Sequence, residues 1–152
     1  MTRPADTLPA ALSITRNATS ADATVSLSYE DRFLRRKVLV TDEGSRFLVN
    51  LDKTHSMNGG DAFVLEDGRR VAVIPAAEDL LEITGPDLIR LAWHIGNRHT
   101  PCQIEPGRLV IRRDHVLKDM LGKLGAQTRE ICEPFTPEGG AYGMGRTHGH
   151  SH

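Results

Sequence analysis

The chain has 152 residues and a mass of 16.7 kDa, enough for one ordinary domain or two small ones. Its 26% charged and 39% hydrophobic residues are typical of a globular protein rather than a disordered one. A net charge of -1 and only 5% aromatic residues argue against a nucleic-acid binder, which needs a basic surface or stacking platforms.

Nothing in the sequence predicts a membrane or secreted protein. No apolar run reaches the roughly 18 residues that a membrane-spanning helix needs. The start of the chain carries Pro4 and Asp6 and lacks the apolar core of a signal peptide. Cys102 and Cys132 form no CxxC pair, which excludes a zinc finger or thioredoxin motif. We therefore expect a cytoplasmic protein with two free thiols.

The first half of the chain has the pattern of a β domain. A short strand is expected around Leu12 and Ile14. Five further apolar stretches follow at 25–29, 37–40, 47–49, 62–65 and 71–74. Turn signals rich in Gly and Asp separate them, and no helical stripe appears. Short strands at such spacing predict a small sandwich or barrel-like domain over residues 1–76.

A helical pattern follows a strand predicted at 80–84. Pro86 and Asp87 suit the first turn of a helix, since proline needs no donor there and the carboxylate complements the helix dipole. The helix carries an apolar stripe, made of Leu88, Ile89, Leu91, Ala92 and Ile95. Gly96 and Asn97 are expected to end it, because both residues tolerate a left-handed backbone.

Further strands and a second helix complete this half of the chain. Two strands are predicted at 102–104 and 109–111, and Asp114 is expected to cap a helix that Gly125 ends. A last strand is predicted at 129–132. Residues 77–137 thus read βαββαβ, the ferredoxin-like arrangement. The fold class expected is α+β, an N-terminal all-β domain followed by a ferredoxin-like domain.

The remaining residues, 138–152, are rich in glycine and poor in apolar side chains, which predicts a flexible tail. Three histidines alternate with Gly and Ser at its end: His148, His150 and His152. Imidazole is a suitable ligand for Ni²⁺, Cu²⁺ and Zn²⁺. Once one imidazole binds an ion, its neighbours act at a high effective concentration. The alternatives are a polar terminus without function or the remnant of a purification tag.

Three other histidines are candidate ligands. His99 lies on a short loop between Gly96 and Pro101, where rigid elements on both sides would fix its direction. Taken alone, a histidine after a helix is more often a cap or a surface residue. His94 lies on the preceding helix. His115 lies in the first turn of the second helix, where the helix field favours the neutral form that a metal needs.

Cys102 and His55 are two further residues of types that can bind a metal. Cys102 could offer a soft ligand near His99, although a buried strand residue is the commoner case. His55 has no partner nearby in sequence and is expected on the surface of a loop. A solitary fixed histidine can still build a metal site when a two-fold axis brings its copy close.

These residues resemble the UreE family of urease accessory nickel chaperones. The specific part is the stretch 96–101, Gly-Asn-Arg-His-Thr-Pro. It is followed by the stretch 113–121, Arg-Asp-His-Val-Leu-Lys-Asp-Met-Leu, and by Gly125. The stretches Pro134-Phe135 and 137–142, with the histidine-containing end, complete the resemblance. It covers the second domain and the tail, and the first half fits more loosely.

The resemblance implies a β domain like a peptide-binding chaperone module, joined to a ferredoxin-like metal-binding domain. It implies a homodimer in which His99 of each protomer holds one Ni²⁺, with His148, His150 and His152 as added ligands. His115 matches an auxiliary position, but Arg113 stands where some members have a second histidine. His94 matches a histidine found in some members only. Zn²⁺ or Cu²⁺ could bind the same site.

The function expected is therefore delivery of Ni²⁺ to the urease apoprotein complex together with the urease accessory GTPase. The protein is expected not to be an enzyme, and no membrane or nucleic-acid partner is expected. Two rivals remain, a metal-responsive regulator or buffer unrelated to urease and a metal-dependent hydrolase using His99 and His115. The basic stretch formed by Arg32, Arg35, Arg36 and Lys37 is expected on a solvated β edge. It could also contact an acidic partner surface.

Overall fold

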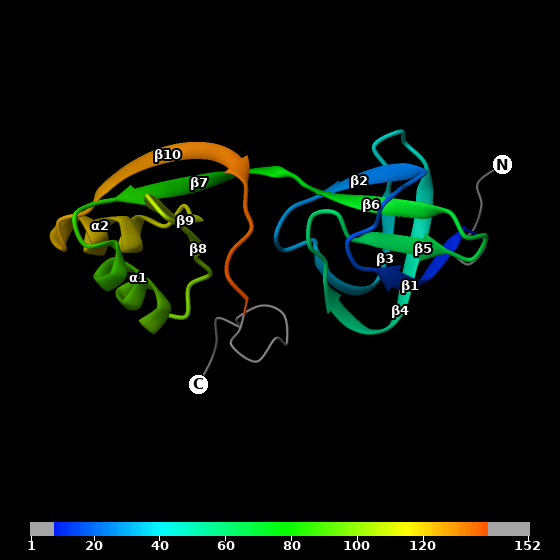
Figure 1. Ribbon diagram of the computed structural model, residues 1–152, viewed down its shortest axis with the longest axis horizontal. Coiled ribbons are helices and arrows are strands. Elements are labelled where there is room, and N and C mark those ends of the chain that lie inside the picture. The colour runs from blue at the N-terminus through cyan, green and yellow to red at the C-terminus, as the bar shows by residue number, and fades with distance from the viewer. Residues whose placement is uncertain (1–7, 140–152) are drawn as a thin grey trace. The chain divides into compact units, whose positions relative to one another are not determined.

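The computed structural model describes residues 8–139, which form two compact units (Figure 1). The first ends at Ala76 and the second begins at Ala77. The predicted α+β class, with an all-β part followed by a βαββαβ part, is confirmed. Neither helix in the described part of the chain has the length and apolar character needed to cross a membrane.

The first unit is one six-stranded sheet with the strand order β2-β6-β5-β1-β4-β3. Its strands are β1 (Ala10–Thr15), β2 (Ala23–Leu27), β3 (Phe33–Val40), β4 (Arg46–Ser56), β5 (Ala62–Leu65) and β6 (Arg70–Pro75). The pairs β1–β4 and β2–β6 are parallel, and the others are antiparallel. The core includes the rings of Phe47 and Phe63, whose centroids lie 5.9 Å apart.

Contacts also join the two outer strands of this sheet, which gives the predicted barrel-like character. The N–H of Asp42, just after β3, donates to the carbonyl of Thr24 in β2 at 2.8 Å. The Thr24 hydroxyl donates back to the Asp42 carboxylate at 2.6 Å. The Arg32 guanidinium donates to the carbonyl of Leu27 at 3.0 Å.

The expectation of a solvated basic edge is wrong for Arg32, which is 3% exposed. Its guanidinium also lies over the Tyr29 ring, 5.9 Å from the centroid. The cation is buried because a carbonyl and an aromatic face replace water around it. Arg35, Arg36 and Lys37 are exposed on the edge strand β3, as expected.

The second unit is a four-stranded antiparallel sheet in the order β10-β7-β9-β8. Its elements are β7 (Ala77–Thr84), α1 (Leu88–Asn97), β8 (Gln103–Glu105), β9 (Arg108–Arg112), α2 (His115–Lys123) and β10 (Gln127–Pro134). Both helices lie on one side of the sheet (Figure 1). They bury Leu91, Ile95, Leu117 and Leu121 in a core with Leu81, Ile83, Leu109 and Ile111.

Aspartates begin both helices. Asp114 caps α2 as predicted, and its carboxylate accepts from the N–H groups of Val116 and Leu117 at 2.9 and 3.1 Å. Asp87 is the N-cap of α1 rather than a residue of its first turn, and it accepts from the N–H of Arg90. The helix therefore starts at Leu88, two residues after the proline that was expected in its first turn, because a capping carboxylate satisfies a free N–H more directly than a dipole contact does.

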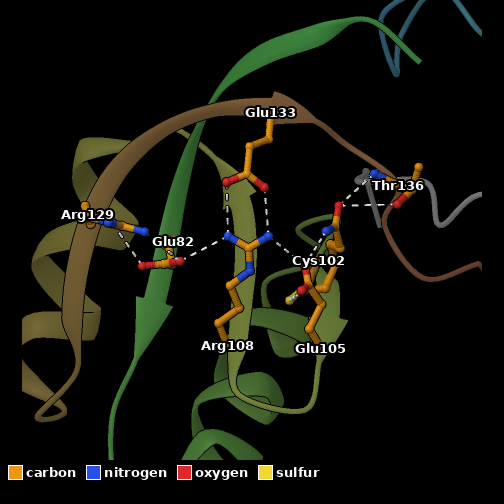
Figure 2. A network of polar contacts seen from close by, with 8 residues as sticks. Glu82, Cys102, Glu105, Arg108, Arg129, Glu133 and Thr136 are labelled. Carbon is orange, nitrogen blue, oxygen red and sulfur yellow. Dashed lines mark hydrogen bonds and ion pairs between the residues drawn. The ribbon is translucent and has the colours of Figure 1, made fainter. Parts of the chain in front are cut away.

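The face of this sheet opposite the helices carries an ion cluster around Arg108 (Figure 2). The guanidinium donates to Glu82 at 3.0 Å, and to Glu133 at 2.8 and 3.3 Å, and it lies 3.0 Å from Glu105. The side chains of Arg108 and Glu82 are 21% and 15% exposed. Hydrogen bonds from Arg108 hold the pKa of Glu82 below its usual value, with a further contribution from Arg129. One cation thus ties β9 to β7, β8 and β10.

We expect Arg108→Met to lower the free energy of unfolding by about 1–3 kcal/mol at neutral pH, because Glu82 and Glu105 lose a charged partner. A carboxylate with a lowered pKa stabilises the fold above its usual pKa, and this stabilisation disappears as the pH falls. The variant should therefore lose less stability than the parent below about pH 4. Denaturant unfolding across pH measures both effects.

Arg129→Met is the matched control for this prediction. Arg129 also binds Glu82, but its side chain is 71% exposed, so its removal should cost only about 0–1 kcal/mol. Equal losses in the two variants would contradict a central role for Arg108.

Candidate metal centre

His99 lies just beyond the end of α1 and has a left-handed backbone, with a φ of 57°. Two hydrogen bonds close the helix around it. The N–H of His99 donates to the carbonyl of Gly96 at 2.9 Å, and the N–H of Thr100 donates to the carbonyl of Ile95 at 3.4 Å. This pair of bonds is the Schellman motif, in which the left-handed residue is usually glycine.

The end of α2 shows the same motif with the usual residue. Gly125 has a φ of 89°, its N–H donates to Gly122, and the N–H of Ala126 donates to Leu121. The expectation that Gly96 and Asn97 supply the left-handed residue of α1 is wrong, since neither has a positive φ. His99 takes that position although a side chain there costs about 1–2 kcal/mol. Strain of this kind is concentrated at functional sites.

His99 borders a recess of about 210 Å³ beside the end of α1. Other parts of its wall come from Thr100, Cys102, Ile104 of β8, and Glu138 and Gly139. The His99 residue is exposed. An imidazole is thus presented to solvent from a short loop that a helix end and a strand hold in place.

Cys102 also lines the recess, but it is a poor ligand there. Burial, together with the nearby carboxylate of Glu138, raises the pKa of the Cys102 thiol to about 11. Metals bind the thiolate, so a thiol that stays protonated at neutral pH competes weakly for an ion. The commoner interpretation of Cys102, a buried strand residue, holds only in part: the residue packs against the core of the second unit, but it is half-buried and lies just before β8.

The structure does not bring the other histidines of the described chain to His99. His94 packs edge-on against Trp93, at 5.1 Å between ring centroids, and borders a separate shallow recess. His115 is the first residue of α2 and borders a groove along that helix. His55 is half-buried at the end of β4, not in a loop, and its Nε2 lies 3.8 Å from Asp52.

The recess of one chain is therefore incomplete as a metal site within residues 8–139. That part of the chain holds no group of three or more His, Cys, Asp or Glu residues able to bind an ion. His148, His150 and His152 lie outside the described residues. That a second copy of His99 and these three histidines supply the remaining ligands stays a prediction.

An exposed apolar face on α1 is a feature that sequence reasoning missed. Ile89 and Trp93, one helical turn apart, are 87% and 63% exposed. The stripe predicted for this helix placed Ile89 toward the core, whereas the buried residues are Leu91 and Ile95. Ile104, which borders the His99 recess, is a further exposed apolar residue at 51%. Large exposed apolar side chains in one region mark an interaction surface.

We expect His99→Gly to raise the free energy of unfolding of the metal-free protein by about 1 kcal/mol, because glycine adopts the left-handed backbone without strain. His99→Ala is the matched control, since it removes the imidazole but keeps a Cβ at the same φ. Urea unfolding of both variants measures the difference. Equal stability of the two would show that backbone strain at residue 99 is negligible.

Comparisons with known proteins agree with this arrangement in both units. Residues 6–76 match the N-terminal domain of the UreE urease accessory protein, and residues 78–152 match its C-terminal domain. A urease accessory protein UreE of Ruegeria pomeroyi is 65% identical over 147 residues, covering 95% of this chain and 99% of that protein. The protein of the same name from Rhodobacter capsulatus is 59% identical, covering 84% of this chain and 81% of that protein. The one from Paracoccus denitrificans is 56% identical, covering 92% of this chain and 90% of that protein. The chain belongs to the UreE family of urease accessory proteins, as the loop around His99 predicted.

Proposed function

We propose that this protein is a cytoplasmic nickel chaperone that binds Ni²⁺ as a homodimer and delivers it for assembly of the urease active site. The observation that carries the proposal is the strained, exposed His99 beside a recess that lacks a complete ligand set within residues 8–139. Family membership supports the link to urease, because the relatives are named as urease accessory proteins.

The dimer supplies the second imidazole. A two-fold axis near α1 brings together two copies of His99 and buries the apolar side chains of Ile89 and Trp93. The proposal thus explains why these side chains are exposed in the single chain. It also explains how one fixed histidine per chain can form a pair of ligands.

The ligand set proposed for the ion suits transfer rather than permanent binding. Two copies of His99 hold the ion, and His148, His150 and His152 add imidazoles that can leave one at a time. His115 and His94 lie apart from the recess and are at most auxiliary. Imidazole also binds Zn²⁺ and Cu²⁺, and Cu²⁺ generally binds more tightly than Ni²⁺. Occupation of the site by nickel therefore depends on which metal ion is available to the protein, not on affinity alone.

The receiving partners that we propose are the urease accessory GTPase and the urease apoprotein. In this role the protein does not alter the ion chemically. It only transfers the ion to the next protein. A general metal buffer would bind Ni²⁺ equally well but would not increase urease activation.

We expect calorimetric titration with Ni²⁺ to give one tight site per dimer. His99→Ala should abolish that site, and a chain truncated after Arg146 should bind more weakly because it keeps His99 but lacks the three later histidines. The same variants added to apo-urease, the GTPase and Ni²⁺ should show a parallel loss of activation. Unchanged Ni²⁺ binding by His99→Ala contradicts the site. Unchanged activation by that variant contradicts the delivery role.

We expect Trp93→Glu to convert the dimer to monomers and to weaken Ni²⁺ binding, because a buried charge on each copy of α1 opposes association. Val116→Glu is the matched control, since Val116 is 51% exposed on α2 and should leave the dimer intact. Sedimentation velocity measures the oligomeric state. A dimer that persists in Trp93→Glu would place the interface elsewhere.

A further inference from the structure

The recess beside His99 has an acidic residue in its wall. Glu138, which follows β10, borders the recess of about 210 Å³ together with His99. It is the only Asp or Glu among the described residues that line this recess. Its carboxylate lies close enough to Cys102, another residue of the wall, for its charge to help raise the pKa of that thiol. An imidazole and a carboxylate thus border the same small recess.

The fold of the second unit holds Glu138 in this place. Phe135, three residues earlier, is fully buried. The N–H of Thr136 donates to the side-chain oxygen of Gln103 at 2.8 Å. The N–H of Glu138 itself donates to the carbonyl of Cys102 at 2.9 Å. The backbone of Glu138 is therefore fastened to the segment that leads into β8, while its side chain is exposed.

The charge of a metal ion gives this carboxylate a use. The imidazole of His99 binds a metal in its neutral form, so it leaves the double positive charge of the ion unbalanced. The Cys102 thiol does not supply a negative charge at neutral pH, because its pKa is raised to about 11. A carboxylate is ionised at that pH, and its oxygens bind first-row metals alongside imidazole.

We propose that Glu138 is a further metal-binding residue, whose carboxylate binds the ion together with His99. This inference rests on the proposed nickel function. Two chains then supply four groups, two imidazoles and two carboxylates. Within residues 8–139 a single chain holds no group of three or more potential ligands, so pairing of two chains is what makes the set large enough.

The test replaces the carboxylate with an amide of the same size. Glu138→Gln removes the charge and keeps the backbone N–H that donates to Cys102. Competition between the protein and a chromophoric chelator for Ni²⁺ measures the affinity of the full chain. We expect Glu138→Gln to weaken binding at least about tenfold, the lower end of the loss caused by removing a group that only supports a metal ligand.

Glu130→Gln is the matched control. Glu130 is an exposed glutamate of β10 in the same unit and does not border the recess. It removes the same charge from the chain, so Ni²⁺ binding should stay unchanged.

Salt distinguishes direct binding from attraction at a distance. At about 0.5 M salt the screening length falls to about 4 Å, so a charge that acts through solvent loses most of its effect. A carboxylate in contact with the ion is not screened in this way. We therefore expect the loss in Glu138→Gln to persist at that salt concentration.

Three outcomes overturn the assignment of Glu138. They are unchanged affinity in Glu138→Gln, an equal loss in Glu130→Gln, and a loss that disappears at high salt. Failure of the proposed function is recognised separately, as Ni²⁺ binding by the wild type that does not depend on His99. If His99→Ala abolishes the site and Glu138→Gln leaves it unchanged, the proposed function stands and only this ligand is wrong.

Discussion

The left-handed backbone at His99 is the constraint on which the candidate site depends. A helix needs such a residue at its C-terminal end if two hydrogen bonds are to close it and the chain is to turn away. At the end of α2 a glycine does this without strain. At the end of α1 a histidine has this conformation instead, so the direction of the Cα–Cβ bond of His99 is set by the same bonds that end the helix. The backbone at residue 99 is therefore part of the helix terminus.

The ion cluster on the opposite face of the sheet gives the strand beside that terminus its place. β8 has three residues and is an edge strand that pairs only with β9 among the described strands. Such a short strand forms few backbone hydrogen bonds with its neighbour. Arg108 connects its Glu105 to β7 and β10 through Glu82 and Glu133. Electrostatics on one face of the sheet thus stabilise the wall of a recess that opens elsewhere on the same unit.

The sequence predicted most of the fold and the main candidate residue. Alternating apolar residues and turn signals located the strands, and helical spacing with Asp114 and Gly125 located α2. The family resemblance selected His99, and the family is confirmed by the comparisons. The ends of α1 were less certain, because Pro86 and Asp87 both suit a helix start and Gly96, Asn97 and His99 all lie near its end. Only the hydrogen bonds distinguish them.

Other features could not be predicted because they depend on contacts between distant parts of the chain. The burial of Arg32 requires the carbonyl of Leu27 and the ring of Tyr29, which a charge pattern does not reveal. The exposure of Ile89 was hidden by a stripe that mixes buried and exposed apolar residues. The hydrogen bond from Thr136 to Gln103 joins segments that meet only in the folded unit. The arrangement of His148, His150 and His152 lies outside the described residues.

The position of Trp93 has a practical consequence. It is the single tryptophan of the chain, it is largely exposed on α1, and the ring of His94 lies edge-on against it. Fluorescence excited at wavelengths that only tryptophan absorbs therefore originates from one face of one helix. Any event that removes water from this face changes the emission of a natural reporter, so that association of α1 with another surface can be followed without a label.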